Sequence, residues 1–186
     1  KTKRNSIIAA LAILRERNLI SNYYSILINK KVPVFAGMGG GTSNAVCLIK
    51  HLVRKKINKN LLSILDKTIG SDSRLFFYEQ GFLKNLKTVN TFPRKYRLYF
   101  LLVYPNVRCS TQYIYSKVRK YSSKSKYSFN KMNNKSKFID LLINKNNDLQ
   151  SIVENKFPII KKLIIEIGQK KGCYFSRMTG SGSVCY

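Results

Sequence analysis

The sequence has no tryptophan, a single histidine, and only eight acidic residues against 35 lysines and arginines. Its four cysteines, Cys47, Cys109, Cys173 and Cys185, include no pair with C-x-x-C spacing, which argues against a metal finger. Scattered cysteines in a chain of this length are typical of reduced thiols, so we expect a cytoplasmic protein.

The sequence also lacks an apolar run long enough to span a bilayer. The apolar run 7–14 follows basic residues, as in a secretory signal, but it has no small-residue cleavage site. Asn5 and Ser6 are favourable helix caps, and the apolar residues that follow share one helical face. This segment therefore predicts an amphipathic helix over 6–18, and we expect no membrane partner.

Positive charge dominates, with a formal net charge of +27. Such an excess fits a nucleic-acid-binding module, an anionic membrane surface, or a polyphosphate ligand beside a solvated basic surface. The basic residues are spread over the whole chain, which favours the last interpretation and no nucleic-acid partner. A hydrophobic fraction of 44% with twelve tyrosines and ten phenylalanines is enough for a folded core.

Hydrophobic periodicity predicts a mixture of helices and strands. Helices are expected at 6–18, 46–54, 61–69, 110–119, 138–143, 149–155 and 159–171. Strands are expected at 24–29, 75–78, 98–104 and 174–178, with a tight turn and a final strand after the last. Segment 120–137 has the composition of a solvated loop. Because no β-α-β rhythm appears, the fold class is α+β.

A glycine-rich segment, Gly37–Ser43, precedes one predicted helix. It is neither a Walker loop, since no lysine precedes Thr42, nor a G-x-G-x-x-G motif. Glycines allow close approach of the backbone, and the start of a helix attracts anions. We therefore predict a polyphosphate site, in which the hydroxyls of Thr42 and Ser43 cap the helix or bind phosphate or Mg²⁺. The alternative is a flexible linker or a plain turn.

Two other polar segments are candidates for chemistry. Asp72, between a helix and a strand, can accept a proton from a hydroxyl or hold Mg²⁺, although the local sequence alone favours a turn or capping aspartate. Residues 179–183 alternate glycine with hydroxyl residues, and can pack on the first glycine segment, touch a substrate, or form only a hairpin turn. Asn147 and Asp148 are interpreted as helix caps.

These segments, in this order, resemble the GHMP small-molecule kinases, a family without a Walker loop. Residues 33–45 (PVFAGMGGGTSNA) are similar to its Pro-x-x-x-Gly-Leu-Gly-Ser-Ser pattern, in the triple-glycine form of some members. Residues 70–72 are similar to the start of Gly-Ala-Asp-Val-Pro, residues 147–150 to Asn-Asp-Leu-Glu, and residues 177–182 to Arg-Met-Ser-Gly-Ser-Gly.

The resemblance implies an N-terminal domain like domain 2 of ribosomal protein S5, incomplete here, over 1–96, and a ferredoxin-like C-terminal domain over 97–186. It implies ATP and Mg²⁺ as cofactors, Asp72 as the catalytic aspartate, and Ser43, with Thr42 beside it, as the Mg²⁺ candidate. The residues implied to bind ATP are Pro33, Val34, Phe35, Ala36, Gly37, Met38, Gly39, Gly40, Gly41, Thr42 and Ser43. Those implied to line the cleft are Thr179, Gly180, Ser181 and Gly182.

The triple glycine is typical of members that phosphorylate the 2-hydroxyl of a cytidine diphosphate-linked methylerythritol, in the non-mevalonate route to isoprenoids. Homoserine, mevalonate or a sugar is the alternative acceptor. Ser73-Arg74 replaces the family's Val-Pro after the aspartate. The family's N-terminal segment, with its active-site lysine and substrate-binding groups, has no counterpart here, and we interpret both ends as cut. We therefore expect this chain alone to bind ATP weakly and to be inactive. The sequence predicts no oligomeric state.

Overall fold

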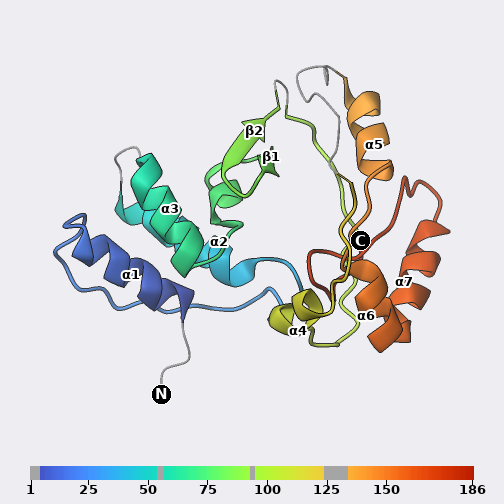
Figure 1. Ribbon diagram of the computed structural model, residues 1–186, viewed down its shortest axis with the longest axis horizontal. Coiled ribbons are helices and arrows are strands. Elements are labelled where there is room, and N and C mark those ends of the chain that lie inside the picture. The colour runs from blue at the N-terminus through green and yellow to red at the C-terminus, as the bar shows by residue number, and fades with distance from the viewer. Residues whose placement is uncertain (1–4, 54–56, 93–94, 124–133) are drawn as a thin grey trace. The chain divides into compact units, whose positions relative to one another are not determined.

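The computed structural model describes residues 5–53, 57–92, 95–123 and 134–186 (Figure 1). The chain forms two compact units. The first unit comprises Lys1–Lys30 and Gly39–Phe92, and the second comprises Lys31–Met38 and Pro93–Tyr186. The glycine-rich segment is therefore divided between the units after Met38. The domain boundary after residue 96 stays a prediction.

Three helices build the core of the first unit: α1 (Ser6–Glu16), α2 (Gly40–Leu52) and α3 (Lys59–Thr68). The side chains of Asn5 and Asn58 cap α1 and α3 by accepting hydrogen bonds from Ile7 N and Leu61 N. All three helices were predicted, because each has good caps or a regular apolar face. Their buried side chains meet in one cluster: Ala10, Ile13, Leu14, Ala45, Ile49, Leu61 and Leu65.

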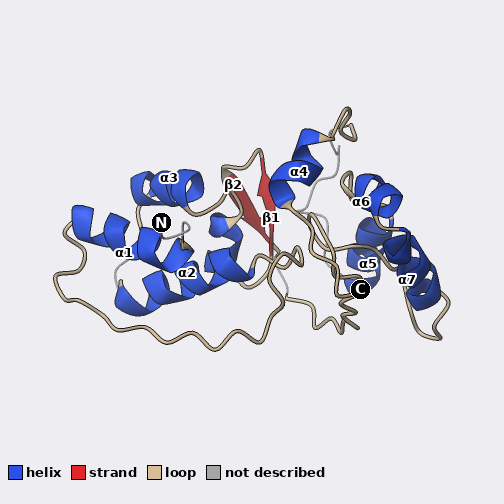
Figure 2. Ribbon diagram, turned by 90° about the horizontal axis from the view of Figure 1, so that it is seen from below, coloured by secondary structure: helices blue, strands red, loops and turns tan. Residues whose placement is uncertain are grey.

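The end of the first unit differs from the prediction. Segment 75–78, expected as a strand, lies mostly within the 3₁₀ helix η1 (Ser73–Phe77), which packs on α2 and α3. A hairpin of β1 (Gly81–Lys84) and β2 (Thr88–Thr91) follows, which the sequence did not predict. Figure 2 shows these strands as adjacent arrows. They pair antiparallel, from Gly81 opposite Thr91 to Lys84 opposite Thr88.

The strand predicted at 24–29 is also wrong. These residues have no regular secondary structure, and most of their side chains are exposed. A strand is stable only when its backbone groups pair with a neighbouring strand, and no described residue pairs with this segment. The β-rich composition was therefore a misleading signal here.

The second unit contains α4 (Thr111–Ser116), α5 (Lys135–Ile143), α6 (Gln150–Lys156) and α7 (Pro158–Gly168). All four helices were predicted, with ends that differ by a few residues. Helices α4, α6 and α7 share a buried cluster with the C-terminal segment: Cys109, Ile114, Leu149, Val153, Ile160, Ile167, Met178 and Cys185. The predicted mixture of helix and sheet is confirmed for the chain as a whole.

Strand pairing in the second unit is shorter than predicted. Only two antiparallel bridges form among the described residues outside the named strands, Val103 to Cys185 and Met178 to Cys185. The predicted strands at 98–104 and 174–178 are thus reduced to single paired positions. Of the predicted loop at 120–137, residues 124–133 lie outside the described residues, and α5 already begins at Lys135.

Candidate active site

Helix α2 begins inside the glycine run rather than after it. Gly39 is its N-cap residue, with a left-handed φ of 63°, and no side chain among the described residues caps the helix. Ser43 N donates to Gly39 O at 2.8 Å, which closes the first turn. The N–H groups of a helix's first turn have no partner within the helix, and the helix dipole adds positive potential there. The predicted start at residue 46 was therefore too late, and the end of α2 that can attract an anion lies on the glycines themselves.

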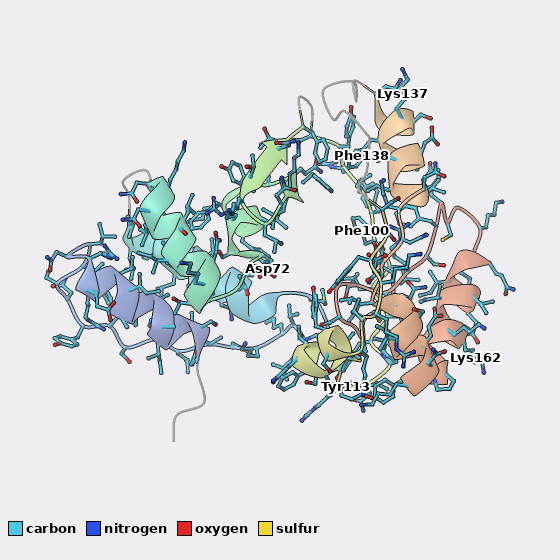
Figure 3. All side chains as sticks on the ribbon, viewed as in Figure 1. Asp72, Phe100, Tyr113, Lys137, Phe138 and Lys162 are labelled. Atoms are coloured by element: carbon cyan, nitrogen blue, oxygen red, sulfur yellow. The ribbon has the colours of Figure 1, made fainter. Side chains whose placement is uncertain are left out.

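The carboxylate of Asp72 lies beside this helix start, within the first unit (Figure 3). A Cβ atom added to Gly39 would lie 3.4 Å from Asp72 Oδ2. One added to Gly70 would lie 2.9 Å from Asp72 Oδ1 and 3.2 Å from Thr42 Oγ1. Gly70 thus leaves room for both the Asp72 carboxylate and the Thr42 hydroxyl, and Gly39 leaves room for the carboxylate beside the start of α2.

The first part of the glycine-rich segment, residues 33–38, belongs to the second unit. Ala36 is buried, and its carbonyl oxygen accepts hydrogen bonds from Thr179 Oγ1 at 3.0 Å and from Val184 N at 3.2 Å. Cys109 N donates to Phe35 O at 3.1 Å. This backbone is therefore fixed by the C-terminal turn. Packing on the glycine-rich segment was one of the three roles predicted for that turn.

Gly37 and the turn Thr179–Gly182 are in close backbone contact. Gly37 has a φ of 72°, and a Cβ atom there would lie 2.3 Å from Thr179 O and 2.8 Å from Gly182 N. A Cβ atom on Gly180 would lie 2.8 Å from Gly37 O. Such distances are too short for any side chain, so both positions require glycine.

Within the turn, Ser181 is turned inward. Its side chain is buried, and its Oγ lies 2.9 Å from Thr111 Oγ1 at the start of α4. The turn is closed by Gly182 N donating to Thr179 O at 2.8 Å. These contacts give the turn a structural role in the second unit. That it also lines a substrate cleft stays a prediction.

Asn147 has a larger role than the helix cap that the sequence suggested. Its Oδ1 accepts from Leu149 N at 3.0 Å, as a cap does. Its Nδ2 donates to Met178 O at 3.0 Å and to Gly180 O at 2.8 Å, so Asn147 also holds the glycine turn. Gln150 Oε1 accepts from Met178 N at 3.1 Å and adds to this support. The sequence placed residues 147–150 in the order of the family motifs, but it contained no indication of these contacts.

Asp66 is a second residue that the sequence reasoning missed. Its carboxylate, on α3, accepts hydrogen bonds from the side chains of Ser73 and Arg74, which directly follow Asp72. Arg74 Nη1 also donates to Lys87 O at 2.6 Å. This network lies next to the candidate catalytic aspartate and fixes the backbone that carries it.

Buried thiols in the second unit are held neutral. Burial, followed by the nearby Glu154 and Cys109, raises the pKa of Cys185 to about 11. Burial also raises the pKa of Cys109, against an opposing effect of Lys156. Cys109 and Cys185 belong to the core cluster, so we assign them a packing role rather than a nucleophilic one.

Protein groups alone do not form a metal centre in the described part of the chain: no group of three or more histidine, cysteine, aspartate or glutamate residues is placed to hold an ion. Ser43, the Mg²⁺ candidate, is half-buried in the first turn of α2. None of the helices in the described ranges has the length and apolarity needed to cross a membrane.

Comparison with known proteins identifies the family. The model of the GHMP kinases N-terminal domain matches residues 5–71, and the model of the GHMP kinases C-terminal region matches residues 128–186. Both models agree with the resemblance found in the four motifs.

Curated relatives match over almost the whole chain. The 4-diphosphocytidyl-2-C-methyl-D-erythritol kinase of Pelagibacter ubique is 36% identical over 98% of this chain and 66% of its own length. The protein of the same name from Buchnera aphidicola of Schizaphis graminum is 32% identical over 98% of this chain and 63% of its own length. The chain thus spans slightly less than two thirds of the length of these relatives.

A solved structure supports the fold. A crystal structure of 4-(cytidine 5'-diphospho)-2C-methyl-D-erythritol kinase matches 98% of this chain and 68% of the solved chain, with a TM-score of 0.57 and 20% sequence identity. At that identity the likeness supports the fold alone. The two matching family models, together with the motifs placed at α2, Asp72 and the C-terminal turn, show that this chain belongs to the GHMP kinase family.

Proposed function

We propose that this chain supplies the ATP-binding segment and the catalytic aspartate of a kinase that phosphorylates the 2-hydroxyl of 4-diphosphocytidyl-2-C-methyl-D-erythritol, in the non-mevalonate route to isoprenoids. Relatives of that name match nearly the whole chain. The observation that carries the proposal is the position of the Asp72 carboxylate, which lies against Gly39 and Gly70 beside the uncapped start of α2.

The residues at the start of α2 fit a nucleotide's phosphates. The helix has no capping side chain, and its first N–H groups and dipole attract negative charge. Glycines at positions 39–41 leave the backbone accessible to phosphate oxygens. In this proposal Pro33–Ser43 holds ATP, with the amides of residues 39–42, which precede the first hydrogen bond of α2, dispersing the charge that develops during transfer.

Mg²⁺ fits the same site only when phosphate is bound there too, because the described residues alone do not form a metal-binding site. Bound Mg²⁺ would neutralise phosphate charge, and the hydroxyls of Ser43 and Thr42 are the nearest candidates to contact it. This chain's own contribution is to position those hydroxyls in the first turn of α2.

Asp72 acts on the acceptor. Its carboxylate accepts the proton of the 2-hydroxyl while the hydroxyl oxygen forms a bond to the terminal phosphorus of ATP. The bond from that phosphorus to the bridging oxygen breaks, and ADP leaves. Because the carboxylate is only half-buried, it is accessible to an acceptor hydroxyl.

We also place this activity in the cytoplasm. Cys47, Cys109, Cys173 and Cys185 are all free thiols in the structure. Free thiols are maintained in a reducing compartment. The proposed partner is thus a small-molecule substrate in the cytoplasm.

The experiment uses the full-length protein with 4-diphosphocytidyl-2-C-methyl-D-erythritol, homoserine, mevalonate and galactose as acceptors. We expect phosphorylation of the first alone. Replacement of Asp72 by Asn should lower kcat by about 10² or more while ATP affinity changes little, since general bases contribute on that scale. Asp148→Asn, which alters a carboxylate bound to Ser122 in the second unit, is the control and should keep kcat.

Two results would contradict the proposal. Preference for another acceptor would retain the family and refute the substrate. Unchanged turnover of the Asp72→Asn protein would remove Asp72 from the mechanism.

A further inference from the structure

Asp66 binds the two residues that directly follow the candidate catalytic aspartate. Ser73 Oγ donates to Asp66 Oδ1 at 2.7 Å, and Arg74 Nε donates to Asp66 Oδ2. Asp66 stands on α3, whose packing against α1 and α2 is part of the core of the first unit. The carboxylate therefore connects a rigid helix to the start of η1.

The network is well shielded from water. The side chains of Asp66 and Arg74 are only 13% and 15% exposed, and Ser73 is fully buried. Arg74 Nη1 donates to Lys87 O at 2.6 Å, in the turn between β1 and β2. A charged pair with this little exposure and additional hydrogen bonds is more restrictive than a surface ion pair. The segment after Asp72 is thereby held to α3 and to the hairpin.

The Asp72 side chain has no comparable support of its own. No group in the described part of the chain donates a hydrogen bond to its carboxylate, and it makes no side-chain cap to η1. Its position against Gly39 and Gly70 therefore follows from its backbone. That backbone is closed by Ser73 N donating to Gly70 O and by Leu75 N donating to Asp72 O, each at 3.0 Å.

We propose that Asp66 is a positioning residue, which holds Ser73 and Arg74 so that the Asp72 carboxylate stays at the start of α2. The family pattern has Val-Pro after the aspartate, and a proline ring restricts the backbone by itself. In this chain Ser73 and Arg74 follow the aspartate instead, and their hydrogen bonds to Asp66 restrict the backbone. The inference rests on the proposed function, in which Asp72 is the base.

The test is a double-mutant cycle in the full-length protein, with Asp66→Ala, Asp72→Asn and the double variant. Asp66→Ala should lower kcat at least about tenfold, because a displacement near 1 Å at a reacting group costs up to about a hundredfold. KM for ATP should change less than about twofold, since the lost interaction serves the transition state. In the Asp72→Asn background, Asp66→Ala should lower kcat no further.

Glu166→Gln is the matched control. Glu166 forms an ion pair with Lys162 at 3.9 Å, but on an exposed helix surface, so its loss should leave kcat unchanged. The thermal unfolding midpoint is measured for every variant. If Asp66→Ala does not fold, Asp66→Asn replaces it in the cycle, because it removes the charge and keeps the shape.

The outcomes separate the two hypotheses. A normal kcat for Asp72→Asn would refute the proposed function and this inference together. A low kcat for Asp72→Asn, with an equal further decrease from Asp66→Ala in both backgrounds, would refute only the positioning role. An unchanged kcat in the Asp66→Ala single variant would also refute only the positioning role.

Discussion

Replacing Gly37 by alanine tests the closest contact in the candidate site. Gly37 has a φ of 72°, where a residue with a Cβ atom costs about 1–2 kcal/mol. The new Cβ atom would also lie 2.3 Å from Thr179 O and 2.8 Å from Gly182 N, both backbone atoms that cannot rotate away. Overpacking of this kind costs about 1–3 kcal/mol. We therefore expect a loss of about 2–5 kcal/mol in the free energy of unfolding, the sum of both costs.

Gly172 supplies a matched control in the same unit. Its φ of 84° is also left-handed, but a Cβ atom there would meet no atom within 4 Å. Gly172→Ala thus includes the conformational cost without the clash, and the entropy change of the unfolded chain is common to both variants. The difference between the two variants, about 1–3 kcal/mol, measures the close approach alone.

Urea unfolding followed by circular dichroism gives both free energies, provided the slope m is unchanged. Titration of the full-length protein with ATP gives the second readout: Gly37→Ala should weaken binding, and Gly172→Ala should leave it unchanged. Equal destabilisation by the two substitutions would show that Gly37 does not contact the turn Thr179–Gly182.

Two further predictions concern stability. Burial raises the pKa of Cys185 to about 11, so with rising pH the unfolded chain loses this thiol proton before the folded chain does. The free energy of unfolding should therefore fall as pH rises from about 9 to 11. This fall should be less steep in Cys185→Ala, and equal slopes in the two proteins would contradict the assignment. Asn58→Ala should destabilise the first unit by about 1 kcal/mol, measured by urea unfolding, because it removes the cap of α3; no change would mean that the cap at Leu61 N contributes nothing.

The helices were predictable because their signals are local. Asn5 caps α1 as predicted, Asn58 caps α3 from a position that the sequence analysis did not single out, and Pro158 at the first position of α7 has the φ that a helix start needs. Strands depend instead on distant partners. Segment 98–104 has the composition of a buried strand, yet in the part of the chain that the structure describes only Val103 pairs, with Cys185 more than eighty positions away.

The hairpin was missed for a related reason. Its turn places Asn85 and Leu86 at φ values of 54° and 55°. Asparagine tolerates this conformation, but leucine is a poor turn residue, so the sequence has no Asn-Gly signal at this point.

The candidate site was predictable as a set of segments but not as a set of contacts. The glycine run at the start of α2 and Asp72 were recognised by motif, and the structure brings Gly39 and Asp72 together within the first unit. The supports were not recognised, because Asp66 and Asn147 act across gaps of several to more than thirty residues. Asparagine can cap a helix and can also hydrogen-bond to a distant turn, and the sequence alone does not distinguish these two roles.

Asn147 offers a way to separate those two roles. Asn147→Asp keeps the oxygen that accepts from Leu149 N, but replaces the amide that donates to Met178 O and Gly180 O by a second acceptor. Two carbonyl oxygens would then face a carboxylate, which costs about 1–3 kcal/mol for the lost hydrogen bonds. If Asn147 braces the turn under Gly37, Asn147→Asp should weaken ATP binding by the full-length protein, whereas Asp148→Asn should not. Normal ATP affinity in Asn147→Asp would reduce Asn147 to a helix cap.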